Sequence, residues 1–145
     1  MNDGAAALLV GSRAVGERYG RRPRARILAG AIAGVEPRLM GLGPVPAIDK
    51  ALQRSGLALA DMDVIEINEA FAAQVLGCTR KLGLADDDPR LNPNGGAIGH
   101  PLGASGARLA LTALRQLERT GGRHALVSLC IGLGQGIACV IERLD

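Results

Sequence analysis

The sequence predicts a layered α/β fold, formed by one domain with its own hydrophobic core. Short apolar runs alternate with segments whose apolar residues recur at helical spacing, which is typical of helices packed on a sheet. The length of 145 residues corresponds to about one domain. Hydrophobic residues make up 48% of the chain and charged residues 21%. These shares are ordinary for a globular protein and unlike those of a disordered one.

The first part of the chain contains an ambiguous run, a short helix and a basic connector. Ala5–Val10 is apolar and precedes a glycine, and its periodicity fits either a buried strand or the start of a helix. Ser12 is a suitable N-cap for a helix over about 13–19, which Gly20 would end. Arg18–Arg26 contains five arginines and a proline. We interpret this segment as a solvated connector rather than an anion site.

The middle of the chain predicts strands that are each followed by a helix. Ala25–Val35 is small and apolar and predicts a strand, whereas Glu36–Pro46 holds three prolines and two glycines and predicts a loop. A helix is expected over Ala47–Arg54. The apolar run Val64–Ile67 predicts the next strand, and the segment after it predicts a helix over Glu69–Leu82.

The last third predicts a glycine-rich loop, a helix and a pair of strands. The loop covers Asn92–Gly106, and the helix covers Ala107–Leu117, with apolar residues at i, i+4 and i+7. Two apolar strands, His124–Ile131 and Ile137–Leu144, flank the glycine-rich bend Gly132–Gly136. The alternation of strands and helices therefore continues to the end of the chain.

Composition argues against several classes of function. Aromatic residues make up 1% of the chain, which disfavours a single-strand nucleic-acid binder that needs stacking platforms. A net charge of +3 is too small for a duplex-binding surface, although it suits an anionic small molecule. No apolar stretch reaches the length of a membrane span, and the N-terminus lacks the basic start of a signal peptide.

The three cysteines, Cys78, Cys130 and Cys139, indicate neither a disulfide framework nor a zinc site. Their number is odd, no pair has the CxxC spacing, and the chain holds two histidines. We therefore expect no metal, and we expect reduced thiols in the cytoplasm. Cys78 and Cys139 lie inside apolar segments and are predicted to be packing residues.

Polar groups occur at three strand ends or glycine-rich bends, where α/β sheets place their sites. Asn68 follows a predicted strand and fits either a helix N-cap or an amide that holds a water or a carbonyl oxygen. His100 lies in a run of glycines that lets the main chain approach a ligand, although an isolated histidine is more often structural. Cys130 precedes alternate glycines and fits either an inert buried thiol or a proton-transfer thiol. Together they form a plausible acyl-transfer constellation.

The segments around these residues resemble known signatures. NEAFAAQ, GHPLGASGAR and C-I-G-x-G-x-G are similar to the C-terminal motifs of the thiolase family, whose members make or break carbon–carbon bonds in 3-oxoacyl-CoA thioesters. MNDGAAALLV resembles a further thiolase segment, so the resemblance covers essentially the whole chain. Within the family, GVEPRLMGLGPVPA, LNPNGG and GLGQG look most like the 3-oxoadipyl-CoA thiolases of the β-ketoadipate route.

The resemblance implies a role for each matched residue. His100 would polarise the thioester oxygen and activate a nucleophilic cysteine, and Cys130 would move the proton on the substrate α-carbon. Asn68 would hold the water that completes one oxyanion hole with His100, and the backbone N–H of Gly132 would serve the other. Phe71 would line the tunnel for CoA or the acyl chain. Coenzyme A would be a substrate, and no cofactor is implied.

Two departures from the family pattern lead to further expectations. The chain begins past the midpoint of the family, and none of its cysteines matches the position of the nucleophile, so we expect no catalysis by this chain alone. Two residues of the family pattern are missing from Gly96–Gly99, just before His100. Such a loss could move the imidazole by roughly 6 Å along an extended chain, against a tolerance of about 0.5 Å for a catalytic group.

The resemblance also implies a division of the chain. Residues 1–23 would be a strand–helix remnant of the first thiolase half, and residues 24–145 the C-terminal domain with the order βαβαβαββ. Ala5–Val10 would be a strand whose partners are absent, so Met1–Gly20 should pack loosely or on an edge. The expected partners are acyl-CoA or CoA, and a separate N-terminal half or a homo-oligomer. A non-catalytic CoA-binding or interaction module is the alternative.

Overall fold

A four-stranded sheet forms the centre of the molecule. The computed structural model describes residues 2–95 and 100–144. The strands are β1 (Ala25–Gly34), β2 (Val64–Ile67), β3 (His124–Ile131) and β4 (Gln135–Arg143), in the spatial order β1-β4-β3-β2. β4 pairs antiparallel with both β1 and β3, whereas β2 pairs parallel with β3. This mixed arrangement confirms the predicted α/β class.

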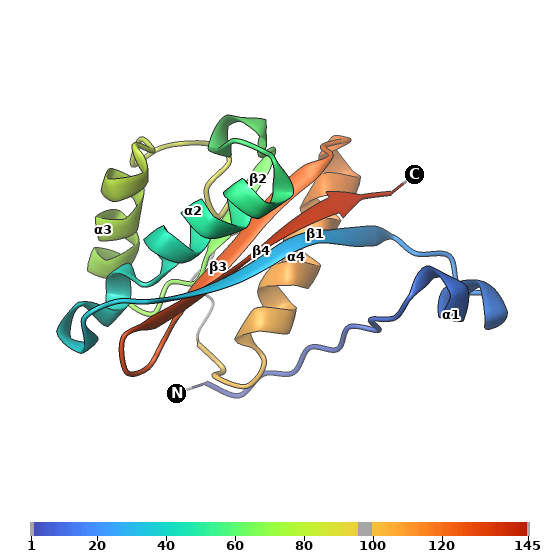
Figure 1. Cartoon of the computed structure of the whole chain (residues 1–145), viewed down its shortest axis with the longest axis horizontal. Coiled ribbons are helices and arrows are strands. Elements are labelled where there is room, and N and C mark those ends of the chain that lie inside the picture. Colours follow the sequence, from blue (N-terminus) through green and yellow to red (C-terminus); the bar gives the residue numbers. More distant parts are fainter. Residues whose placement is uncertain (1, 96–99, 145) are drawn as a thin grey trace.

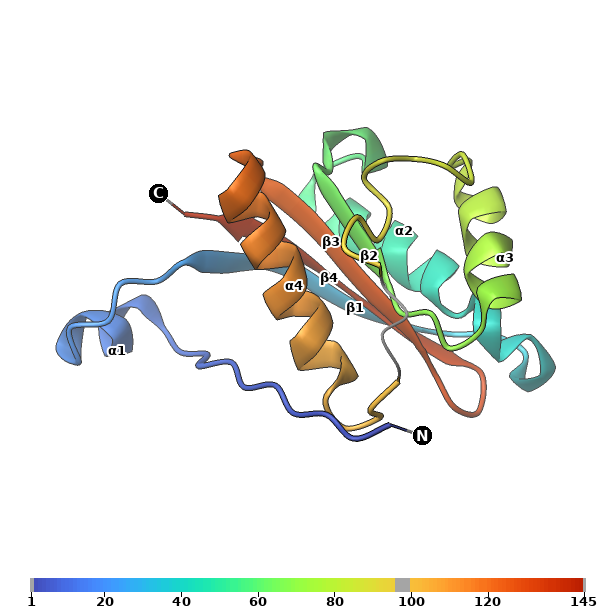
Figure 2. The same cartoon turned by 180° about the vertical axis from the view of Figure 1, so that it is seen from behind.

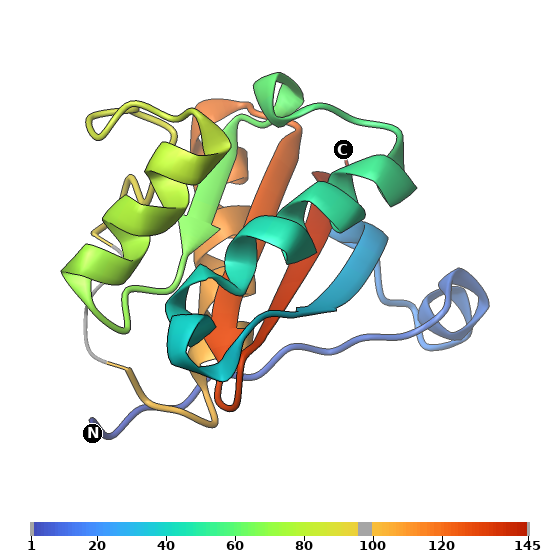
Figure 3. The same ribbon diagram turned by 60° about the vertical axis from the view of Figure 1, so that its left-hand side comes forward.

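Helices cover both faces of the sheet, which gives three layers. The helices are α1 (Arg13–Arg18), α2 (Pro44–Ser55), α3 (Ala72–Leu82) and α4 (Ser105–Thr120), and the 3₁₀ turns are η1 (Pro37–Leu42) and η2 (Leu59–Asp61). Helices α2 and α3 lie on one side of the sheet and α4 on the other (Figures 1 and 3). Two of the predicted stops are confirmed: α2 and α3 end at Gly56 and Gly83, whose φ angles of 72° and 70° favour glycine.

Two segments that were expected to be loops contain helical residues. The segment expected to be a loop, Glu36–Pro46, contains η1 and the first turn of α2, which begins at Pro44. Proline is tolerated there because the N–H that it lacks has no partner inside a helix in any case. Helix α4 begins at Ser105, inside the segment expected to be a glycine-rich loop.

One strand of the expected βαβαβαββ order is reduced to a single bridge within the described residues. Between α3 and α4, Leu91 pairs with Ile65 at the free edge of β2. Ile65 N–H donates to the carbonyl of Arg90 at 2.8 Å, and Asn92 N–H donates to the carbonyl of Ile65 at 2.8 Å. Asn92 has a φ of 42°, so the backbone turns away from the sheet after this one pair.

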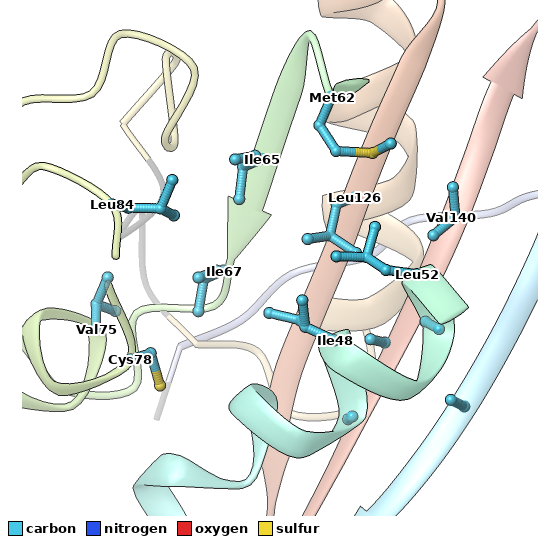
Figure 4. Packing of buried hydrophobic residues seen from close by; sticks show 14 residues of the cluster. Ile48, Leu52, Met62, Ile65, Ile67, Val75, Cys78, Leu84, Leu126 and Val140 are labelled. Atoms are coloured by element: carbon cyan, nitrogen blue, oxygen red, sulfur yellow. The ribbon is translucent and has the colours of Figure 1, made fainter. Parts of the chain in front are cut away.

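The main core lies between the sheet and the helices α2 and α3. Figure 4 shows side chains from all three elements meeting there, including Ile48 of α2, Val75 of α3 and Leu126 of β3. On the opposite face, Leu109 and Leu117 of α4 are completely buried. Burying each such aliphatic side chain stabilises the fold by about 1.5–3 kcal/mol, so both layers of helices are anchored to the sheet.

The N-terminal segment lies outside the sheet. Residues 2–12 form no helix or strand, and they run past the start of α4 to the separate helix α1 (Figure 2). Leu9 is 91% exposed, and the run Ala5–Val10 pairs with no strand in the described part of the chain. Near its start the segment lies against the loop after His100, since a Cβ at Gly4 would meet Pro101 Cγ at 2.8 Å.

Candidate functional site

Asn68 is a buried residue at the end of β2 and not a helix cap. Its N–H continues the ladder by donating to the carbonyl of Ser128 at 2.9 Å, and its residue is 1% exposed. Helix α3 begins at Ala72 with Phe71 in the N-cap position. The N-cap interpretation of Asn68 and the helix start at Glu69 are therefore wrong. Because the carboxamide caps no helix, it is available for other contacts.

His100 is held by the first turn of α4. Its Nδ1 lies 2.6 Å from Oγ of Ser105, a completely buried residue, and this hydroxyl donates to the carbonyl of Pro101 at 3.0 Å. The hydroxyl of Ser105 therefore holds the imidazole ring from its Nδ1 side. The Nε2 side of the ring points away from this contact.

The structure brings Asn68 and His100 together, with Arg108 behind them. Nδ2 of Asn68 lies 3.4 Å from Nδ1 of His100, and Nη2 of Arg108 donates to Oδ1 of Asn68 at 3.4 Å. The amide nitrogen of Asn68 therefore faces the imidazole, and its oxygen faces the guanidinium. The four side chains of Asn68, His100, Ser105 and Arg108 form one connected group, which we call the imidazole cluster.

Cys130 lies on the neighbouring strand, near the end of β3. It is 6% exposed, and strand alternation places it on the face of Leu126, toward α2 and α3. Burial raises the pKa of its thiol, which therefore stays protonated at neutral pH. Burial also raises the pKa of Cys78 on α3, and the nearby Cys130 adds to this rise. Within the described part of the chain, no hydrogen bond joins Cys130 to the imidazole cluster.

The bend between β3 and β4 leaves backbone groups accessible. Space is open around Gly132, where an added Cβ would meet nothing within 4 Å. Leu133 follows with a φ of 62° and is 85% exposed. No backbone hydrogen bond of the described residues uses the Gly132 N–H, so this N–H is free to donate to a ligand oxygen.

Phe71, the residue expected to line the ligand tunnel, lies on the surface. Phe71 is 72% exposed, so its ring is available for contact with a bound molecule.

The two-residue loss before the histidine falls on Gly96–Gly99, which lies outside the described residues. Within the described part of the chain, no group of three acidic, histidine or cysteine side chains could hold a metal ion. Across the same residues, no helix is long and apolar enough to cross a membrane.

Sequence reasoning assigned no role to two members of the imidazole cluster, Ser105 and Arg108, or to Glu66. Ser105 and Arg108 lie three positions apart on α4, so both side chains point to the same side of the helix. Glu66 is a buried acid inside the otherwise apolar strand β2. A charged residue in the middle of a four-residue buried strand is a signal that the sequence already carried.

Comparison with known proteins decides the family. The family model described as "Thiolase, C-terminal domain" matches residues 21–143. The chain belongs to the thiolase family. A 3-oxoadipyl-CoA/3-oxo-5,6-dehydrosuberyl-CoA thiolase of Escherichia coli K12 is 64% identical to it over 146 aligned positions. A beta-ketoadipyl-CoA thiolase of Acinetobacter baylyi is 62% identical over the same length. Each alignment covers 99% of this chain and 36% of the relative.

A solved thiolase structure has the same fold. Human mitochondrial 3-ketoacyl-CoA thiolase superposes with a TM-score of 0.88 and 46% sequence identity, over 92% of this chain and 34% of that one. The expected thiolase C-terminal fold is therefore confirmed. The chain spans about a third of the length of the thiolases it matches, and it corresponds to their C-terminal part, a domain of acyl-transferring enzymes.

Proposed function

We propose that this domain supplies the proton-transfer and oxyanion groups of a thiolase that cleaves a 3-oxoacyl-CoA. The contact between Asn68 and His100 carries the proposal, because it places a carboxamide beside an imidazole. Imidazole and amide donors at one point suit a reaction in which a carbonyl oxygen gains negative charge. The identity of 64% with a 3-oxoadipyl-CoA thiolase supports 3-oxoadipyl-CoA as the substrate.

The proposed reaction has two steps. A cysteine thiolate, formed as His100 takes its proton, attacks C3 of the 3-oxoacyl-CoA, and the bond between C2 and C3 then breaks. The acyl group stays on that cysteine, and Cys130 protonates C2 of the departing acetyl-CoA enolate. Cys130, left as a thiolate, then takes the proton of the coenzyme A thiol, whose sulfur attacks the acyl-cysteine. The bond between the acyl carbon and the cysteine sulfur breaks, which releases the shortened acyl-CoA, and the cysteine takes its proton back from His100.

Each group of the domain has a defined task in this scheme. His100 and a water held by Asn68 stabilise the thioester enolate oxygen, and the N–H of Gly132 stabilises the oxygen of the tetrahedral adduct. Cys130 suits proton transfer rather than nucleophilic attack, because its raised pKa keeps it protonated. Phe71, which is exposed, contacts coenzyme A or the acyl chain. Coenzyme A is a substrate here, and the scheme requires no metal or other cofactor.

The nucleophilic cysteine comes from a thiolase segment outside this sequence. The relatives are almost three times as long as the aligned region, so a large N-terminal part accompanies this domain in them. Apolar side chains on the described surface support such a partner: Ile27 and Ile32 of β1 are 56% and 55% exposed, and Leu9 is 91% exposed. We place the partner on this surface. The free state of all three cysteines supports a reducing compartment such as the cytoplasm.

Complementation tests the proposed function. The chain is produced alone and together with the N-terminal part of the E. coli relative, and CoA-dependent loss of 3-oxoadipyl-CoA is measured. We expect activity from the combined proteins and none from either alone. His100→Ala and Cys130→Ala should each abolish this activity. Cys139→Ala should retain it, because this cysteine lies on the face of the sheet opposite to Cys130. Activity that survives His100→Ala or Cys130→Ala would refute the assigned roles.

A further inference from the structure

Asn92 is a residue outside the imidazole cluster whose side chain pairs with the backbone of β2. It directly follows the isolated bridge between Leu91 and Ile65, where its φ of 42° turns the chain away from the sheet. Its Oδ1 accepts a hydrogen bond from the N–H of Ile67 at 2.8 Å, and its Nδ2 donates to the carbonyl of the same residue at 3.0 Å. The carboxamide of Asn92 therefore makes the pair of bonds that a backbone peptide group would make.

This side chain continues the pairing at the edge of β2 after the backbone has left it. At Ile65 the partners are backbone groups, namely the carbonyl of Arg90 and the N–H of Asn92, each at 2.8 Å. Two residues further along β2, Ile67 is completely buried, and a buried N–H or carbonyl without a partner costs free energy. Asparagine suits this position, because it offers a donor and an acceptor and tolerates a positive φ better than most residues.

The contacts of Asn92 lie on both sides of Asn68. The carbonyl of Ile67 and the N–H of Asn68 belong to one planar peptide group. Asn92 holds this group at the carbonyl, and the carbonyl of Ser128 holds it at the N–H, at 2.9 Å. Nδ2 of Asn92 also donates to Oε1 of Glu69, the next residue, at 2.6 Å. The backbone that carries the Asn68 side chain is therefore fixed before and after it.

We propose that Asn92 is a positioning residue, whose carboxamide fixes the backbone around Asn68 and thereby the place of the Asn68 side chain. Asn68 is 1% exposed, and its Nδ2 lies 3.4 Å from Nδ1 of His100. A group that takes part in catalysis has to be held within about 0.5 Å of its productive position. This inference rests on the proposed function, because that function gives the Asn68 carboxamide its task.

Asn94 offers a matched control in the same segment. Its carboxamide donates to Oε1 of Gln116 and accepts from Arg119, both on α4. Asn94→Gly therefore removes a carboxamide two residues from Asn92 and leaves the contacts with β2 in place. Asn92→Gly removes the proposed contacts, and glycine adopts a φ of 42° without strain.

Amide hydrogen exchange of the chain, followed by nuclear magnetic resonance, tests the proposal without any assay of catalysis. We expect the Ile67 N–H to exchange about tenfold faster in Asn92→Gly, because it loses its acceptor, and the side-chain NH₂ signal of Asn68 to shift. The N–H groups of Leu126 and Val140, two completely buried residues of β3 and β4, should keep their wild-type exchange rates. Asn94→Gly should leave all of these signals as in the wild type.

Two results would overturn the proposal. One is an Asn68 NH₂ signal that does not move in Asn92→Gly. The other is exchange that accelerates by the same factor at Ile67, Leu126 and Val140, because this would show a general loss of stability instead of a local one.

Asn92→Asp gives a second measurement if Asn92→Gly does not fold. Aspartate keeps an oxygen for the N–H of Ile67 but has no donor for the Ile67 carbonyl or for Glu69. We expect the Ile67 N–H to stay protected from exchange and the Asn68 NH₂ signal to move. An Asn68 signal that stays in place in Asn92→Asp would refute the positioning role.

The complemented enzyme provides a kinetic measurement. We expect Asn92→Gly to lower kcat by about tenfold or more and to change KM for 3-oxoadipyl-CoA by less than about twofold, because a displaced catalytic group slows the reaction without weakening the binding of substrate. Asn94→Gly should keep both values. An increased KM with an unchanged kcat would contradict the proposal. If the wild-type proteins show no activity together, the proposed reaction is rejected, and the exchange measurements alone decide whether Asn92 positions Asn68.

Discussion

The stability of the chain should depend on pH through Glu66, and replacing Glu66 by Gln should remove this dependence. Burial raises the pKa of Glu66 from 4.5 to about 7 in the folded state. The folded state therefore binds this proton more strongly than the unfolded state does. Between about pH 4.5 and pH 7 the folded state holds more protons at this residue, so stability contributed by Glu66 falls as the pH rises.

The size of this effect follows from the change in pKa. One pKa unit corresponds to 1.36 kcal/mol, so the change from 4.5 to about 7 corresponds to about 3 kcal/mol of folding free energy, lost between pH 4 and pH 8. Glutamine has a similar shape and no titrating proton. Relative to the wild type, Glu66→Gln should therefore gain about 3 kcal/mol of stability over the same range of pH.

Urea unfolding of both proteins at pH 4.5, 6 and 8, followed by circular dichroism, measures this difference. Contributions from the two histidines and the other carboxyl groups are common to both proteins and cancel in the comparison. Glu118→Gln serves as the control, since Glu118 is partly exposed and paired with Arg24. A free-energy difference between wild type and Glu66→Gln that stays constant from pH 4.5 to pH 8 would refute the reasoning about burial.

Five other substitutions test the fold, two of them as controls. Glu142→Gln should cost about 1–2 kcal/mol of stability at pH 7, because the carboxylate accepts hydrogen bonds from the exposed guanidinium groups of Arg123 and Arg26. These two groups lower the pKa of Glu142, so the wild type loses this stability as the pH falls below about 4.5. Thermal melting of both proteins at pH 7 and pH 4 checks this. Leu117→Ala, at a completely buried side chain, should cost about 2–5 kcal/mol in urea unfolding, whereas Leu9→Ala, at an exposed one, should stay within about 0.5 kcal/mol. Gly136→Ala should prevent folding because its Cβ would meet backbone atoms, whereas Gly132→Ala has open space and should keep the circular dichroism spectrum of the wild type.

The secondary structure could be predicted from the sequence where a local pattern decides it. The strand Val64–Ile67 has the predicted bounds, and Gly83 ends a helix as expected. The start of α3 could not be predicted, because Asn68 has the residue type of an N-cap but continues the ladder to Ser128 instead. Pairing with a distant strand decided this position, and no local propensity contains that information.

The candidate site was predictable in its residue types and only partly in its contacts. His100 and Asn68 were expected to converge, and they lie 3.4 Å apart at their nearest nitrogens. The part played by Ser105 was not foreseen, because it depends on the start of α4 two residues earlier than expected. The placement of Cys130 beside Asn68 and His100 stays a prediction, since strand alternation directs its thiol toward the other face of the sheet.

The polar groups of the site are concentrated where the fold is least favourable to them. Glu66 and Asn68 are each 1% exposed, and Ser105 is completely buried, although apolar side chains would fill such positions at lower cost. Among the residues that the structure describes, Oε1 of Glu66 has no partner, which is difficult to explain by stability alone. Energetically costly groups that gather around one imidazole are typical of a functional site. The burial of Asn68 and Ser105 is therefore better explained by their contacts with His100 than by stability.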